Sequence, residues 1–123
     1  GCILKLVNNM IGVASLHITA EALSLAEKLG LDLSIVLPIL DKSTGRGFLT
    51  QDLETTRRQY RAWTESDDAF ESFVRICEKD LSIASDLAES SNISLPVTQE
   101  ILSSMKSLPK DVVHRWRSLG IDK

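Results

Sequence analysis

The feature that most constrains this chain is its first segment, residues 2–29, which contains no proline and only one internal glycine, Gly12. Its apolar side chains fall on nearly every face of a helix, and Gly30 follows where a left-handed residue commonly ends one. A helix that is apolar all round must be covered all round. At ~1.5 Å per residue the segment is ~42 Å long, whereas a compact domain of this length spans roughly 35 Å. We therefore predict one long central helix whose first turns need cover from another domain or subunit.

The rest of the sequence is also predicted to be helical. Apolar residues recur at helical spacing, and no stretch alternates convincingly with the period of two that a strand requires. The predicted fold class is all-α, a single multi-helix domain over residues 1–123 built around the long first helix. The predicted helices cover residues 2–29, 33–41 (capped by Asp32 and containing Pro38), 50 or 52 to 64, 69–89, 96–107 and 109–120, with a loop over 43–47.

Composition and charge exclude several classes of protein. The formal net charge of −3 argues against a nucleic-acid surface, because such a surface needs clustered Lys and Arg. The most apolar stretch, residues 10–20, is short and contains His17, so no membrane-spanning helix and no membrane partner are expected. Cys2 and Cys77 form no disulfide framework and have no metal-ligand spacing. Two free thiols fit a reducing compartment, and we expect a cytoplasmic protein.

Three polar side chains lie on one face of the first turns of the long helix. Lys5, Asn8 and Asn9 follow the i, i+3, i+4 spacing that places side chains together. This trio suits a small oxygen-rich ligand, because the ammonium donates to one oxygen and an amide donates to or accepts from another. The same spacing also fits a frayed helix start with a solvated lysine and two surface asparagines. The residues alone leave both interpretations open.

Other polar groups carry weaker signals. Lys79 lies between apolar stretches of a predicted helix, where it could reach an anionic ligand or belong to a solvated stripe with Glu78 and Asp80. His17 and Glu21 have the i, i+4 spacing of metal ligands, but two ligands are too few, so core packing or a local pair is expected. No glycine-rich loop follows a predicted strand, so the chain has no nucleotide cradle of its own.

Five short matches, in order and at similar spacing, resemble the C-terminal domain of 3-hydroxyisobutyrate dehydrogenase and the related β-hydroxyacid dehydrogenases. The resemblance covers about residues 1–107. It implies an all-helical domain like the C-terminal domain of 6-phosphogluconate dehydrogenase, with a long central first helix. The matching letters are G-C-I-L-K-L-V-N-N at 1–9, E-A-L at 21–23 followed by K-L-G-L-D at 28–32, S-T-G-R at 43–46, K-D-L at 79–81 and L-P at 95–96.

The resemblance also implies roles for particular residues. Lys5 would be the catalytic lysine, which protonates the carbonyl oxygen as hydride arrives at carbon and takes the proton back during oxidation. Asn9, with Asn8 as its neighbour, would hold the oxygens of a small 3-hydroxyacid, and Lys79 would reach over NAD or NADP. An N-terminal Rossmann domain would hold most of the cofactor, and the protein would form a homodimer. This chain by itself is then expected to be inactive.

A second hypothesis belongs to another class of protein. The long apolar helix fits a non-catalytic helical dimerisation or binding module equally well, including one that descends from such an enzyme and has lost its chemistry. A strand and a glycine-rich turn upstream of Gly1 in the gene would favour the dehydrogenase, and their absence would favour the module.

Overall fold

The computed structural model describes residues 2–108 and 110–121, and over these residues it contains six helices and no strand. The predicted all-α fold is therefore confirmed, and each helix agrees with the sequence prediction to within a few residues at its ends. The predicted helix start at Pro109 lies outside the described residues. The helices are α1 (Cys2–Lys28), α2 (Leu33–Leu40), α3 (Leu53–Ala62), α4 (Asp67–Ser90), α5 (Pro96–Lys106) and α6 (Lys110–Gly120).

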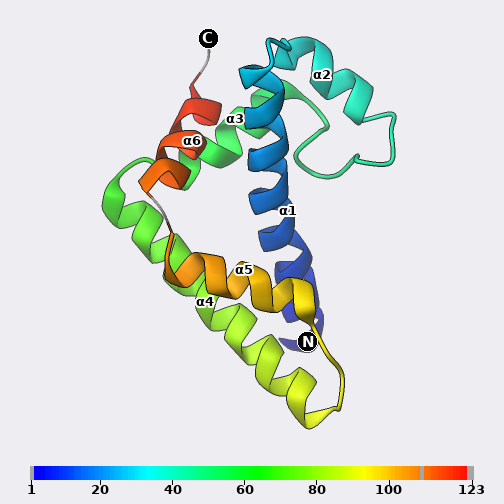
Figure 1. The fold of residues 1–123 in the computed structure, drawn as a ribbon, viewed down its shortest axis with the longest axis vertical. Coiled ribbons are helices and arrows are strands. Elements are labelled where there is room, and N and C mark those ends of the chain that lie inside the picture. Colours follow the sequence, from blue (N-terminus) through cyan, green and yellow to red (C-terminus); the bar gives the residue numbers. More distant parts are fainter. Residues whose placement is uncertain (1, 109, 122–123) are drawn as a thin grey trace.

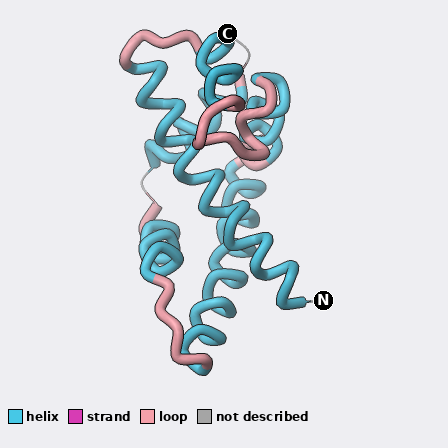
Figure 2. The backbone as a smooth tube through the Cα atoms, turned by 90° about the vertical axis from the view of Figure 1, so that its right-hand side faces the viewer, coloured by secondary structure: helices cyan, strands magenta, loops and turns pink. Residues whose placement is uncertain are grey.

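Helix α1 forms the axis of the molecule. It contacts α2, α4, α5 and α6, while α3 packs closely against α6 (Figure 1). Helices α4 and α5 lie along the N-terminal half of α1, and α2, α3 and α6 gather around its C-terminal half (Figure 1). The first turns of α1 project from the body of the molecule (Figure 2). The predicted central position of the long helix is thus confirmed.

Local sequence signals set the helix ends. The Asp32 carboxylate accepts a hydrogen bond from a backbone N–H in the first turn of α2, and Asp52 and Ser66 cap α3 and α4 in the same way. Gly30, with φ of 90°, ends α1, and Asn92, with φ of 57°, follows α4. Both residues have the left-handed conformation that lets the following N–H groups turn back to the last carbonyls of a helix.

The core is centred on Trp116 of α6, which is 1% exposed. Its ring makes edge contacts with Tyr60 and Phe70, at centroid distances of 5.2 Å and 5.6 Å. The ring of His17 lies 5.4 Å away, so the predicted core packing of this histidine is confirmed. The Tyr60 hydroxyl donates a 2.8 Å hydrogen bond to the backbone carbonyl of Leu16 in α1. Helices α1, α3, α4 and α6 thus meet at one aromatic cluster.

The C-terminal end of α6 is held by two arginines of α3. The Arg57 guanidinium donates to the carbonyls of Leu119 and Ile121 at 2.9 Å and 2.7 Å, and Arg61 donates to the carbonyl of Gly120 at 2.9 Å. These carbonyls lie at the negative end of the α6 dipole, where cations are stabilising. A Cβ at Gly120 would lie 2.9 Å from the backbone nitrogen of Arg61, so the close packing of α3 on α6 requires a glycine there.

The covering of α1 differs from the sequence prediction. The helix was expected to be buried all round, but its fully buried residues form a single stripe: Val13, Leu16, Ala20 and Leu23. The opposite face carries large apolar side chains seven residues apart that are 60–72% exposed, namely Leu4, Ile11, Ile18 and Leu25. The other helices of this chain are too few to surround α1. The sequence analysis expected cover from another domain or subunit only for the first turns of the helix, whereas the exposed stripe extends to Leu25.

Helix α1 also differs from the prediction in its membrane-spanning potential. The sequence analysis expected no helix that could cross a membrane, because the most apolar stretch is short. By length and composition, α1 is long and apolar enough to do so. Core helices of soluble proteins and signal sequences pass the same test, so this property alone does not place α1 in a bilayer.

Candidate active site

The N-terminal half of α1 and the C-terminal half of α4 run side by side in opposite directions and enclose a groove of about 350 Å³. Lys5, Asn9 and Lys79, which the sequence analysis singled out, all line this groove. Two of them come from α1 and the third from α4. The complete lining is Cys2, Ile3, Lys5, Leu6 and Asn9 from α1 with Lys79, Asp80, Ile83 and Leu87 from α4.

A hydrogen bond joins the two walls of the groove. The side-chain amide of Asn9 donates through Nδ2 to Oδ2 of Asp80 at 2.9 Å. Asn8 donates through its own Nδ2 to Oδ1 of Asn9 at 3.4 Å. The Asp80 carboxylate therefore fixes the orientation of the Asn9 amide and leaves its carbonyl oxygen with a free lone pair. Asn8 is exposed and is not among the described residues that line the groove, so of the two asparagines only Asn9 faces it.

Two ammonium groups border the groove. Lys5 and Lys79 are both exposed, and none of the ion pairs between described residues involves either of them. Asp80 is the carboxylate among the described lining residues, and it accepts a hydrogen bond from Asn9. Two cations against one carboxylate favour an anionic ligand, to which ammonium groups form strong charge-assisted hydrogen bonds.

Sequence reasoning missed Asp80 as a member of this site. We considered it part of a solvated stripe, whereas its side chain is half-buried and contacts Asn9 across the groove. Its place in the K-D-L match was the only available signal.

Cys77, one turn before Asp80, is buried. This burial, followed by the charge of Asp80, raises the pKa of its thiol to about 12. Cys77 therefore stays protonated and is no nucleophile for this site.

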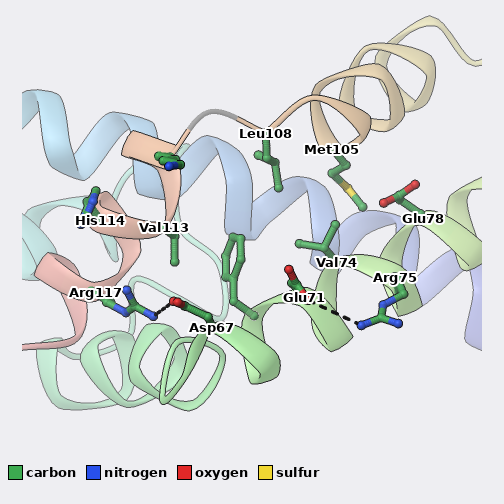
Figure 3. Close-up of a pocket in the computed structure, with 12 residues that line it drawn as sticks. Asp67, Glu71, Val74, Arg75, Glu78, Met105, Leu108, Val113, His114 and Arg117 are labelled. Carbon is green, nitrogen blue, oxygen red and sulfur yellow. Dashed lines mark hydrogen bonds and ion pairs between the residues drawn. The ribbon is translucent and has the colours of Figure 1, made fainter.

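A larger cavity of about 770 Å³ lies between α4, α5 and α6 (Figure 3). Its floor is apolar, with Val74, Met105, Leu108 and Val113 pointing inward (Figure 3). Much of the charge on its rim is already paired, because Arg117 lies 2.6 Å from Asp67 and Arg75 lies 3.8 Å from Glu71. It contains none of the predicted site residues. We therefore place the candidate site in the smaller groove, where both cations are free of ion pairs.

The comparison with known protein families favours the dehydrogenase hypothesis. A family model described as NAD-binding of NADP-dependent 3-hydroxyisobutyrate dehydrogenase matches residues 1–116. The chain belongs to this family. The match extends past residue 107, where the sequence resemblance ended, and so takes in most of α6. No curated protein and no solved structure matches the chain.

Membership makes this a domain of the NAD(P)-dependent dehydrogenase type. The donor set of the groove fits one wall of such a site, since Lys5 and Lys79 suit the negative charges of a substrate carboxylate or a dinucleotide. The described residues contain no strand followed by a glycine-rich turn, the element that cradles a pyrophosphate.

Proposed function

We propose that this domain forms the catalytic wall of an NAD(P)-dependent dehydrogenase that acts on a small 3-hydroxyacid. The observation that carries the proposal is the shared groove of Lys5, Asn9 and Lys79. The sequence resemblance gives these residues a catalytic, a substrate-binding and a cofactor-binding role. Helical spacing already places Lys5 near Asn9, but only the packing of α4 on α1 brings Lys79 to them.

The groove residues can perform the proton part of the reaction. A bound NAD(P) supplies or accepts the hydride. During oxidation, the neutral amine of Lys5 takes the proton from the substrate hydroxyl, and during reduction its ammonium returns that proton to the carbonyl oxygen. One N–H of the Asn9 amide is held by Asp80, and the second donates to the substrate oxygen, which leaves the hydroxyl proton to Lys5. Lys79 provides positive charge on the opposite wall of the groove.

Two further parts complete the proposed enzyme. An N-terminal Rossmann domain holds the cofactor, because the groove provides two cations but no phosphate cradle. A second copy of the chain covers the exposed stripe of α1, since an apolar strip of this length marks an interaction surface. A cytoplasmic setting belongs to the same proposal, because both cysteines are free thiols.

The test is the substitution Lys5→Ala in the full-length protein, assayed for hydroxyacid oxidation with NAD⁺ or NADP⁺. We expect kcat to fall by ~10²–10⁴, the usual contribution of a positioned acid–base group. Lys5→Arg should restore little activity, because a guanidinium does not give up its proton in proteins. Lys28→Ala, at the exposed far end of the same helix, is the matched control and should retain turnover. Near-normal turnover of Lys5→Ala would refute the proposed role.

The exposed stripe of α1 also supports the alternative of a non-catalytic dimerisation module. The two functions differ in their response to dinucleotide. A dehydrogenase should bind NADH in the full-length form, detected by quenching of protein fluorescence, whereas a module should not.

A further inference from the structure

The candidate groove changes in character along its length. Because α1 and α4 run in opposite directions, residues of rising number on α1 face residues of falling number on α4. The polar end holds the amide and the carboxylate that are hydrogen-bonded to each other. Beyond it, each successive helical turn contributes one aliphatic side chain from each wall. From the hydrogen-bonded Asn9 and Asp80, the lining continues with Leu6 and Ile3 along α1 and with Ile83 and Leu87 along α4.

The aliphatic end of the groove is open to a ligand. Ile83 is 41% exposed and Leu87 is 45% exposed, although both line the groove. Neither belongs to the hydrophobic core cluster, and the exposed part of their apolar surface is open to a ligand. Lys79 adjoins Asp80 at the polar end, and Lys5 lies one helical turn from Asn9, between Leu6 and Ile3 on α1. The groove therefore has a hydrogen-bonding end with one cation beside it, a second cation one turn along α1, and aliphatic side chains from Leu6 onward.

The groove is larger than a 3-hydroxyisobutyrate ion, the hydroxyacid in the description of the family. A 3-hydroxyisobutyrate ion has seven heavy atoms. If each heavy atom takes at most the ~30 Å³ that one water molecule takes in the liquid, the ion occupies no more than roughly 200 Å³. The groove measures about 350 Å³. With the carboxylate and hydroxyl at the polar end, the remaining space lies beside Ile83 and Leu87. A methyl group would leave this hydrocarbon surface largely uncovered.

We propose that the preferred substrates are 3-hydroxyacids whose C2 carries an alkyl group longer than methyl, which lies along Leu6, Ile83 and Leu87. This inference rests on the proposed function, because it takes Lys5 and Asn9 to hold the reacting end. The alkyl group gains the free energy of leaving water, while the polar end fixes the orientation of the substrate. The alternative occupants of the hydrocarbon end are another domain or a second copy of the chain, and the experiment separates them from the substrate.

The experiment measures kcat/KM of the full-length enzyme for 3-hydroxypropionate and its 2-methyl, 2-ethyl and 2-propyl derivatives. We expect kcat/KM to rise about fourfold with each carbon, the factor that corresponds to ~0.8 kcal/mol per buried CH₂. Simple carboxylates that lack the hydroxyl provide a readout of binding without turnover. Their inhibition constants should fall in the same proportion from propanoate to hexanoate.

Two substitutions test the location of the alkyl group. Ile83→Ser and Leu87→Ser should each reduce the rise to less than about twofold per carbon, because the alkyl group would then meet a hydroxyl instead of hydrocarbon. Ile76→Ser is the matched control, since Ile76 lies on the same helix, is 59% exposed and is not among the described residues of the groove. The control should keep the full rise of kcat/KM with each added carbon.

The outcomes distinguish this inference from the proposed function. If Lys5→Ala abolishes turnover while the substrate series is flat or greatest at methyl, the proposed function stands and the substrate inference is wrong. The substrate inference is also wrong if neither Ile83→Ser nor Ile76→Ser changes the rise of kcat/KM with alkyl length. A change in oligomeric state or melting temperature at Ile83→Ser without a change in slope overturns it as well, because protein would then cover the hydrocarbon end. If Lys5→Ala keeps normal turnover, both proposals fail.

Discussion

The two halves of α1 behave as different structural elements. In the C-terminal half, Ala20 and Leu23 are at most 1% exposed, and the carbonyl of Leu16 accepts the Tyr60 hydroxyl. In the N-terminal half, Ile3 and Leu4 are more than 70% exposed, and the polar side chains face an open groove. One continuous helix thus links a closed core to an open surface. The rigid half can position the groove residues without contributing to the groove itself.

The difference shows where stability and chemistry are located in this domain. Around α3 and α6, much of the hydrogen-bonding capacity of the charged side chains is used internally, as in the Arg57 and Arg61 contacts with the end of α6. Around the groove, Lys5 and Lys79 form no ion pair with another described residue. At functional sites, proteins commonly leave charged and polar side chains without a partner in the same chain. The comparison predicts that substitutions in the first region change folding and substitutions in the second change binding.

The largest effect is expected from Trp116→Ala. Removing this ring leaves a cavity where α1, α3, α4 and α6 meet, and such a change costs ~3–5 kcal/mol. Leu4→Ala, in the open half of α1, should change the free energy of unfolding of the isolated subunit by less than about 0.5 kcal/mol. Urea unfolding followed by circular dichroism measures both. Equal losses from the two substitutions would remove the distinction between the halves.

An intermediate effect is expected on self-association. If a second copy covers the exposed stripe of α1, Ile11→Glu places a charge in an apolar interface, where an unpaired charge is costly. Sedimentation equilibrium should show the dimer dissociating at concentrations at which the wild type remains dimeric. Ile76→Glu, an equally exposed position on α4, is the control and should remain dimeric. A dimer that tolerates Ile11→Glu would show that another surface forms the interface.

The smallest effect is expected from pH. Burial against Trp116 lowers the pKa of His17 below 6.5, while Glu21 partly opposes this shift. The unfolded chain then binds a proton at a pH at which the folded chain does not. Stability contributed by neutral His17 is therefore complete above pH ~6.5 and declines as the pH falls toward the folded pKa.

His17→Phe should remove this part of the pH dependence, because it keeps an aromatic ring beside Trp116 but does not titrate. Urea midpoints between pH 8 and pH 5 measure the change. Glu21→Gln is a second test: it lowers the folded pKa of His17 further, because it removes the charge that favours the protonated form, and so should extend the decline to lower pH without changing the pH at which it begins. A wild-type slope that persists in His17→Phe would assign the dependence to other groups.

Much of the fold could be predicted from the sequence because its signals are local. Gly30 and Asp32 mark the boundary between α1 and α2, and apolar spacing gives the remaining helices. The proximity of Lys5 to Asn9 also follows from local geometry, because one helical turn separates them. The sequence resemblance indicated the dehydrogenase family, which the family comparison confirms.

The rest depends on contacts between distant residues. Asn9 and Asp80 are 71 positions apart, so no spacing rule predicts their hydrogen bond. The exposed face of α1 was missed because its periodicity shows which side chains are apolar but does not show how many neighbouring helices are available to cover them. The cavity between α4, α5 and α6 arises where these helices diverge, and no sequence signal marked it.

The anchoring of α6 by Arg57 and Arg61 has a practical consequence for labelling the protein. The end of α6 lies at the opposite end of the molecule from the first turns of α1 and their groove (Figure 1). A fluorophore or an immobilisation tag joined after Ile121 would start from a rigid point of attachment. Ligand titrations on a sensor surface could then be performed with the groove facing away from the support.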